Sequence, residues 1–302
     1  MITVEHLTYE YPGKRALDDI SFNIRNGSIT ALVGPNGAGK TTLLKCLAAL
    51  TPPFAGRIFI GDTDILKAPR KCHRILGFLP DFFGLYDALT VEQSLTYFAL
   101  ARNMEKGRVA ARVREVADAI DLTEKFREKV GSLSRGMRQR LALGQAMIHD
   151  PQVLLLDEPA SGLDPEARYK LARLFLDLNR SGKTLLVSSH ILSELDQYAT
   201  DLLIIRQGRI VENTLSLSGE QRERRKLCIR LVSAPPDIVE IAGRFEGVSD
   251  PEVTDDTLSL IFEGDDEQQH ALLKSLVLSG VSVKEFFVRR EGVQEQYLDI
   301  VR

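Results

Sequence analysis

One continuous segment near the N-terminus places an apolar run, a glycine-rich loop and a helical pattern in direct succession. It reads SITALVG, then GPNGAGKT over residues 34–41, then TTLLKCLAAL. The loop matches the pattern G-x-x-x-x-G-K-[S/T], and this pattern binds phosphate when a strand precedes it and a helix follows it. By average composition, roughly one chain in 100 of this length contains such a match by chance. The segment therefore predicts a nucleotide site on an α/β core.

The residue types in this loop fit the chemistry of a triphosphate. Glycines permit backbone conformations in which successive N–H groups turn toward phosphate oxygens. We expect Lys40 to reach the β and γ phosphates, and the Thr41 hydroxyl to ligate Mg²⁺. The predicted nucleotide-binding residues of this segment are Gly34, Pro35, Asn36, Gly37, Ala38, Gly39, Lys40, Thr41 and Thr42.

A second motif, VLLLDEP at residues 153–159, supplies acidic groups. Its four apolar residues predict a buried strand that brings Asp157 to its carboxyl end, where ligands bind in open α/β sheets. We expect Asp157 to hold Mg²⁺ through water, and Glu158 to accept a proton from the water that attacks the γ phosphate. Taken alone, the pair has a simpler interpretation as an acidic strand end that caps the next helix.

Strand and helix patterns alternate along most of the chain, which predicts a parallel sheet covered on both faces. We expect an α/β domain over residues 1–213, with a helical insertion at about 82–148. A linker over residues 214–226 contains the charged stretch GEQRERRK. The remainder, 227–302, is a small α+β domain with the element order β-α-β-β-α-β, which is ferredoxin-like.

Composition narrows the function classes. The chain has 302 residues and a formal net charge of -3, so its charge gives no indication of nucleic-acid binding. It lacks a run of about 18 apolar residues that would span a membrane and an apolar stretch of signal-peptide length. Cys46, Cys72 and Cys228 are odd in number and widely spaced, which predicts neither a disulfide framework nor a metal site. These features predict a cytoplasmic protein.

The segment LSRGMRQRL, residues 133–141, places a serine, a glycine and arginines at the start of a predicted helix. Ser134 can cap this helix, whereas a glycine at 136 costs helix stability in an ordinary sequence. The positive end of a helix dipole and its unpaired N–H groups bind anions. The pattern therefore predicts an anion site at this helix end.

Together these motifs resemble the ATP-binding-cassette (ABC) ATPases over residues 1 to about 213. LSRGMRQRL is similar to the family's signature, usually LSGGQ, with Arg135 and Met137 in place of a glycine and a glutamine. In this family two cassettes pack head to tail, and each signature closes over the ATP on the other's phosphate loop. The resemblance implies a second cassette as partner, with Ser134 and Gly136 contacting the γ phosphate of its ATP.

Four further positions follow from the resemblance. Tyr11 matches the family's aromatic residue that stacks on adenine, with a strand-end tyrosine packed on the core as the alternative. His190 resembles the switch histidine that contacts the γ phosphate, and we count it with Glu158 as catalytic. SGLD, residues 161–164, resembles the D-loop on the dimer seam. Asp81 replaces the Q-loop glutamine, and we expect it to reach Mg²⁺ through water.

LPDFFGLYDALTV and SRGMRQRL resemble the branch whose cassettes serve separate membrane subunits of exporter type. The resemblance implies an ATPase subunit on the inner face of the membrane that drives export through a permease. We expect the insertion and the loop from Asp81 to Tyr86 to contact that permease, with packing under the insertion as the alternative for Phe82, Phe83 and Leu85. The competing functions are an ABC-type ATPase acting on nucleic acid or ribosomes, and a regulatory cassette with weak hydrolysis.

Overall fold

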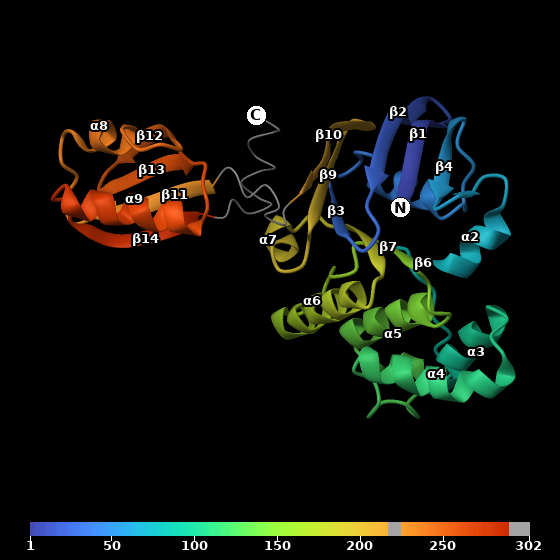
Figure 1. Cartoon of the computed structure of the whole chain (residues 1–302). Coiled ribbons are helices and arrows are strands. Elements are labelled where there is room, and N and C mark those ends of the chain that lie inside the picture. The colour runs from blue at the N-terminus through green and yellow to red at the C-terminus, as the bar shows by residue number, and fades with distance from the viewer. Residues whose placement is uncertain (217–224, 290–302) are drawn as a thin grey trace. The chain divides into compact units, whose positions relative to one another are not determined.

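The computed structural model describes residues 1–216 and 225–289, and the chain divides into two compact units (Figure 1). Within the described residues the first unit comprises 1–216 and the second 225–289. No described helix combines the length and the apolar character that crossing a membrane requires.

The first unit contains β1 (Ile2–Tyr11), β2 (Lys14–Ile24), β3 (Ile29–Val33), α1 (Lys40–Leu47), β4 (Ala55–Ile60), β5 (Thr63–Asp64), α2 (Pro69–Ile75), β6 (Leu76–Leu79), α3 (Val91–Ala101), α4 (Lys106–Ala119), η1 (Val130–Ser132), α5 (Arg135–Met147), β7 (Val153–Asp157), α6 (Pro165–Arg180), β8 (Thr184–Ser188), α7 (Leu192–Leu195), β9 (Asp201–Arg206) and β10 (Arg209–Ser216).

Two sheets form the frame of the first unit. A six-stranded sheet has the order β10-β9-β3-β8-β7-β6, and all its neighbouring strands are parallel except β10 and β9. Every residue of β3, β7 and β8 is buried, as their continuous apolar sequences predict for a sheet covered on both faces. The N-terminal strands form a separate antiparallel sheet, β2-β1-β4-β5, which their alternating pattern allowed but did not specify.

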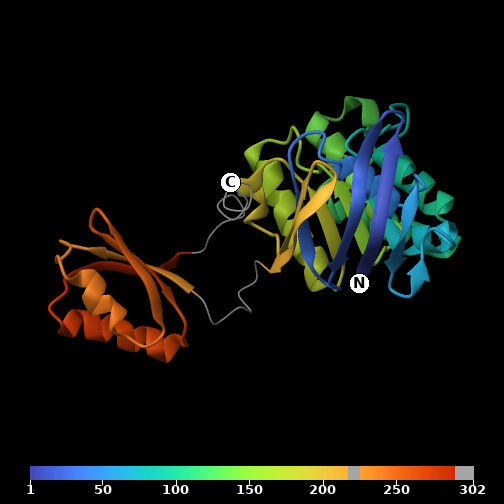
Figure 2. The same cartoon turned by 90° about the horizontal axis from the view of Figure 1, so that it is seen from above.

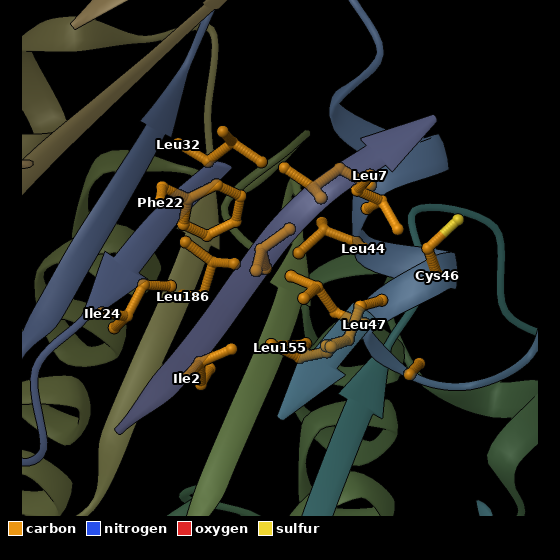
Figure 3. Close-up of a cluster of buried hydrophobic side chains, with 14 of the residues drawn as sticks. Ile2, Leu7, Phe22, Ile24, Leu32, Leu44, Cys46, Leu47, Leu155 and Leu186 are labelled. Carbon is orange, nitrogen blue, oxygen red and sulfur yellow. The ribbon is translucent and has the colours of Figure 1, made fainter. Parts of the chain in front are cut away.

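Helix α1 packs between these two sheets (Figure 3). Complete burial of one of its large apolar side chains stabilises the fold by about 1.5–3 kcal/mol. This packing fixes α1 directly behind β3, so the loop between them is held at the carboxyl end of the parallel sheet. The cluster around α1 includes Leu44, Cys46 and Leu47 of the helix, Ile2, Leu7, Phe22 and Ile24 of the antiparallel sheet, and Leu32, Leu155 and Leu186 of the parallel sheet.

Helices α3, α4 and α5 form a layer of their own in the first unit (Figure 1), within the stretch predicted as a helical insertion. Thr90 begins α3 with a capping box, because its Oγ1 accepts from the Gln93 N–H at 3.1 Å and its own N–H donates to Gln93 Oε1 at 2.9 Å. The apolar faces of the three helices meet in a separate core that includes Val91, Leu95, Val113, Val116 and Leu141.

The second unit is a four-stranded antiparallel sheet with the order β12-β13-β11-β14. Both of its helices lie on one face of the sheet (Figure 2), and their apolar residues share a core with alternate residues of the strands. This arrangement is the ferredoxin-like order that the sequence predicted. Its elements are β11 (Arg225–Leu231), α8 (Ile238–Gly243), β12 (Val248–Thr254), β13 (Thr257–Phe262), α9 (Asp266–Leu278) and β14 (Val283–Arg289).

Two sequence-based boundaries differ from the structure. ILSELDQYA was expected to be one helix, but α7 has only four residues, because Gln197 and Tyr198 bond to carbonyls three residues back in tight turns. The predicted linker, 214–226, overlaps strands at both ends, since β10 runs to Ser216 and β11 begins at Arg225. Its central part, residues 217–224, lies outside the described residues.

Candidate functional site

Two glycines of the loop between β3 and α1 lie where no side chain would fit. A Cβ on Gly34 would overlap the carbonyl oxygen of Ile205 on the neighbouring strand β9. Gly39 has φ +113°, and a Cβ there would lie 2.7 Å from the carbonyl oxygen of Ala16. Gly39 is also the N-cap of α1, and neither a side-chain cap nor an acidic residue occupies the first turn. The N–H groups at this helix end therefore remain available to an anion.

Lys40 folds back over this loop. Its Nζ donates to the carbonyl oxygen of Gly34 at 2.7 Å and lies 3.4 Å from that of Pro35. The side chain is buried, and this desolvation lowers the pKa of Lys40, while nearby Glu158 and Asp157 act to raise it. An ammonium group with little water around it interacts strongly with a phosphate that enters the loop.

Asp157 stands at the end of β7, directly opposite Ser188 at the end of β8. Its Oδ1 accepts a 2.6 Å hydrogen bond from Ser188 Oγ, whereas its Oδ2 is buried and has no hydrogen-bond partner among the described residues. A buried carboxylate oxygen without a partner carries a desolvation cost of several kcal/mol unless a cation or a donor compensates it. The free oxygen is thus an acceptor held in place before any ligand arrives.

Glu158 takes a backbone conformation that is uncommon for a side-chain-bearing residue, with φ 51°. Two bonds hold it there: its N–H donates to Ser188 Oγ at 3.0 Å, and its carbonyl accepts from the Ser161 N–H at 3.1 Å. Its Oε2 lies 2.6 Å from His190 Nδ1, in the segment after β8. The structure therefore brings together the two residues that the sequence predicted to be catalytic.

Asp81, in the loop after β6, belongs to the same acidic group. Desolvation raises its pKa first, and the charges of Asp157 and Glu158 raise it further, while Arg135 and His190 act in the opposite direction. Three carboxylates at one sheet edge repel one another, so this edge attracts a cation. Within residues 1–216 and 225–289, however, no group of three His, Cys, Asp or Glu side chains has the arrangement of a complete metal site.

Tyr11 lies at the end of β1, beside the start of α1. Its hydroxyl is 3.3 Å from Thr42 Oγ1, and its ring meets that of Tyr9 edge-on at 4.9 Å. The residue remains 43% exposed, which places Tyr11 at the surface beside the first turn of α1 and not in the core.

Ser134 and Gly136 lie at the exposed start of α5. Ser134 is the N-cap and accepts from the Met137 N–H at 3.3 Å. A Cβ on Gly136 would lie 3.3 Å from Leu163 in the SGLD segment of the same chain. The sequence therefore predicted the helix start correctly, and this end of α5 carries no acidic residue that would oppose an anion.

Ser188 has no predicted role in the sequence, although its hydroxyl binds both Asp157 and the Glu158 N–H. Its position was visible as the serine that ends the apolar strand TLLVS. The missing information was that β8 pairs with β7, because strands far apart in the sequence become neighbours only in the folded sheet.

A cavity of about 1250 Å³ lies away from the phosphate loop, between α2, β6 and the helical layer. Its size exceeds the roughly 300–1,000 Å³ of ordinary small-molecule pockets. Among the residues that the structure describes, no carboxylate forms an ion pair with any of four lining arginines, Arg70, Arg74, Arg102 and Arg108. We call this feature the basic groove.

His149 lines the basic groove, and its protonation is expected to make the stability of the fold depend on pH. Its Nε2 meets the Leu76 carbonyl at 3.0 Å, and its Nδ1 is buried without a partner, so a second proton has no acceptor. Burial first, and then the charge of Arg102, lower the pKa of His149 to about 4 from 6.5. As pH falls through this interval the unfolded chain binds a proton that the folded chain excludes, so the free energy of unfolding falls.

Between pH 7 and pH 4 the free energy of unfolding should fall by about 1–2 kcal/mol more in the parent than in His149→Gln, allowing for partial solvent screening. Urea unfolding at a series of pH values measures how the free energy of unfolding of each protein depends on pH. Equal slopes in the two proteins would show that His149 takes up its proton normally in the folded chain.

Comparisons with known proteins agree with this geometry. The ABC transporter family profile matches residues 17–161. The Nod factor export ATP-binding protein I of Burkholderia pseudomallei (strain 1710b) is 36% identical over 208 residues, covering 69% of this chain and 68% of that protein. The bacitracin transport ATP-binding protein BcrA of Bacillus licheniformis is 29% identical over 302 residues, covering 100% of this chain and 97% of BcrA.

Among solved structures, a dimeric bacterial ABC transporter cassette, MJ0796, superimposes with a TM-score of 0.65 at 26% identity, covering 72% of this chain and 100% of that chain. The profile match begins within β2 and runs through the phosphate loop, Asp81 and the start of α5 to the acidic end of β7 and Ser161. Tyr11, Ser188 and His190 lie outside the matched residues. The chain is thus an ATP-binding subunit of the ABC transporter family, whose cassettes hydrolyse ATP.

Proposed function

We propose that the chain is the ATPase subunit of an exporter, working as a head-to-tail homodimer beneath a separate membrane permease on the cytoplasmic side. The names of its relatives, Nod factor export and bacitracin transport, support the direction and the class of activity. The likeness to a dimeric cassette supports the dimer. The observation that carries the proposal is the group of Lys40, Asp157 and Glu158 at one end of the parallel sheet.

Mg²⁺ fits this site because Asp157 Oδ2 is buried and unpaired among the described residues. We assign the ion to Thr41 directly and to Asp157 and Asp81 through water, and expect phosphate oxygens and water to complete its shell. When bound, Mg²⁺ neutralises charge on the phosphates. Oxygens of the ligand and of water would then form most of the shell, and within the described ranges no three side chains form a metal site by themselves.

In the proposed mechanism, the loop N–H groups and Lys40 hold the triphosphate, and Tyr11 stacks on the adenine. Glu158 accepts the proton of the attacking water, and His190 orients that carboxylate through their 2.6 Å contact. Ser134 and Gly136 of the second chain seal the γ phosphate with the positive end of α5. Closure of two such sites presses on the permease.

The arginines of the basic groove support a contact with an acidic segment of the permease. Arg102 donates to the His73 carbonyl at 2.7 Å and loses water there, so its pKa is lowered by burial without a carboxylate to compensate. Carboxylates on a permease segment would provide that compensation. The nearby loop also exposes apolar surface: Phe82 is 92% exposed and Tyr86 58% exposed, whereas Leu85 packs against the helical layer. The exposure of Phe82 and Tyr86 supports the permease contact for these residues, and the packing of Leu85 supports the alternative for that one.

Purification from detergent extract tests the assignment. We expect a polytopic membrane protein to co-purify with the parent, and the double variant Arg74→Glu, Arg108→Glu to retain less than about a tenth of it. Both arginines are exposed, so the variant's own ATPase activity should stay at the parent's level. Arg127→Glu, an exposed reversal outside the groove, is the matched control. Recovery of ribosomes or DNA in place of a membrane protein would overturn the proposal.

A further inference from the structure

The segment from Glu158 to the start of α6 is a short chain of two linked turns. The Ser161 N–H bonds to the Glu158 carbonyl at 3.1 Å, and the Leu163 N–H bonds to the Ala160 carbonyl at 3.2 Å. Asp164 then caps α6 by accepting from the Ala167 N–H at 2.8 Å. These bonds connect Leu163 to Ala160 and Ser161 to Glu158, so the backbone from Gly162 back to Glu158 is tied by hydrogen bonds as well as by the chain. We call residues 158–164 the catalytic turn.

The side chain of Arg135 lies directly against this turn. Gly162 has φ +72°, and a Cβ built on it would lie 2.6 Å from Arg135 Cζ and 2.7 Å from its Nε. The guanidinium thus occupies the space that any side chain at 162 would need. The next residue of α5, Gly136, approaches Leu163 closely enough that a Cβ would lie 3.3 Å from its Cδ2. The start of α5 consequently contacts the catalytic turn at two successive residues.

Arg135 lies against the turn without a direct polar partner among the described residues, and its charge acts on nearby Asp81. In the described part of the chain its guanidinium has no hydrogen-bond or ion-pair partner, and the residue is exposed on its other side. A planar guanidinium can lie flat on a peptide surface that a side chain does not cover, whereas an ammonium cannot. Glycine at 162 and arginine at 135 therefore form a matched pair.

We propose that Arg135 is a positioning residue that couples the phosphate-facing start of α5 to Glu158 of the same chain. The inference rests on the proposed head-to-tail dimer, in which Ser134 faces the ATP of one site while Glu158 acts at the other. A shift of α5 as it closes on the partner's ATP moves Arg135 and the catalytic turn together. ATP binding at one site thereby changes the position of the Glu158 carboxylate at the other site.

The first test is the ATP dependence of hydrolysis in Arg135→Ala. We expect kcat to fall about fivefold or more and the Hill coefficient to approach 1, while ATP affinity in a non-hydrolysing binding assay stays within about twofold. Arg138→Ala is the matched control, since that arginine of the same helix binds Asp87 at 2.6 Å and not the turn. It should keep the parent's Hill coefficient. Arg135→Lys restores charge without the planar contact, so full recovery by lysine would contradict the packing role.

The second test is a double-mutant cycle with Gly162→Ala. In the parent a methyl group displaces the guanidinium, so we expect at least about a tenfold loss of kcat. In Arg135→Ala the three atoms nearest that methyl group are absent, and the strain of a positive φ is the cost that remains. The loss there should be several-fold smaller. Additive losses, in variants with the parent's melting temperature, would overturn the coupling. A parent that neither dimerises with ATP nor shows cooperativity would instead overturn the proposed function, and the coupling with it.

Discussion

Glu158→Gln is expected to reduce ATP hydrolysis by at least about 100-fold while ATP remains bound, because general-base catalysis contributes on the order of 10²–10⁴. Glutamine matches glutamate in size but cannot accept the proton of the attacking water. The backbone bonds to Ser188 and Ser161 do not involve the side chain, so the turn should keep its conformation. Phosphate release measures the rate, and size-exclusion chromatography with ATP should show a trapped dimer.

Glu166→Gln is the matched control for this substitution. Glu166 lies in the first turn of α6, and its exposed carboxylate pairs only with Lys170 at 3.1 Å. Its rate should stay within about twofold of the parent's, because surface pairs of this kind contribute little. Hydrolysis by Glu158→Gln at the parent's rate would remove Glu158 from the role of base.

Lys40→Ala is expected to act on binding. Hydrogen bonds from a charged donor contribute about 1.5–3 kcal/mol each, so loss of the ammonium should weaken ATP binding by about 100-fold. AMP, which lacks the phosphates that Lys40 is expected to reach, should bind almost as it does to the parent. The empty protein should not be destabilised, because Lys40 is a desolvated cation that donates only to the carbonyls of Gly34 and Pro35.

Calorimetric titration with ATP, ADP and AMP measures these affinities. Lys45→Ala provides the control, since Lys45 belongs to the last turn of the same helix, away from the loop. It should bind all three nucleotides like the parent. An unchanged dissociation constant for ATP in Lys40→Ala would contradict the placement of the triphosphate in this loop.

Local patterns predicted the parts of the site that one segment builds by itself. The loop with Lys40 and the strand ending in Asp157 needed only a motif and an apolar run, and the structure places both at the same sheet edge. The roles of these residues stay predictions, as do those of Tyr11 and Asp81. What a single segment could not specify was long-range pairing, such as β8 beside β7, which brings Ser188 to the two acidic residues.

The contact of Arg135 with Gly162 illustrates the same limit. In the sequence, the arginine reads as a departure from the family signature and the glycine as part of a neighbouring motif. Only the packing of α5 beside the catalytic turn shows that one residue fills the space left by the other. The expected helix over ILSELDQYA was shortened for a related reason, since tight turns replace its second half where the chain leads into β9.

A structure of Glu158→Gln with ATP and Mg²⁺ would show whether each ATP is held by two chains. We predict a two-fold dimer in which Ser134 Oγ of one chain lies about 2.7–3.0 Å from a γ-phosphate oxygen of the ATP held by Lys40 of the other. A structure with ATP bound, in which Ser134 of every chain faces solvent or its own chain and no second chain contacts the γ phosphate, would contradict the account.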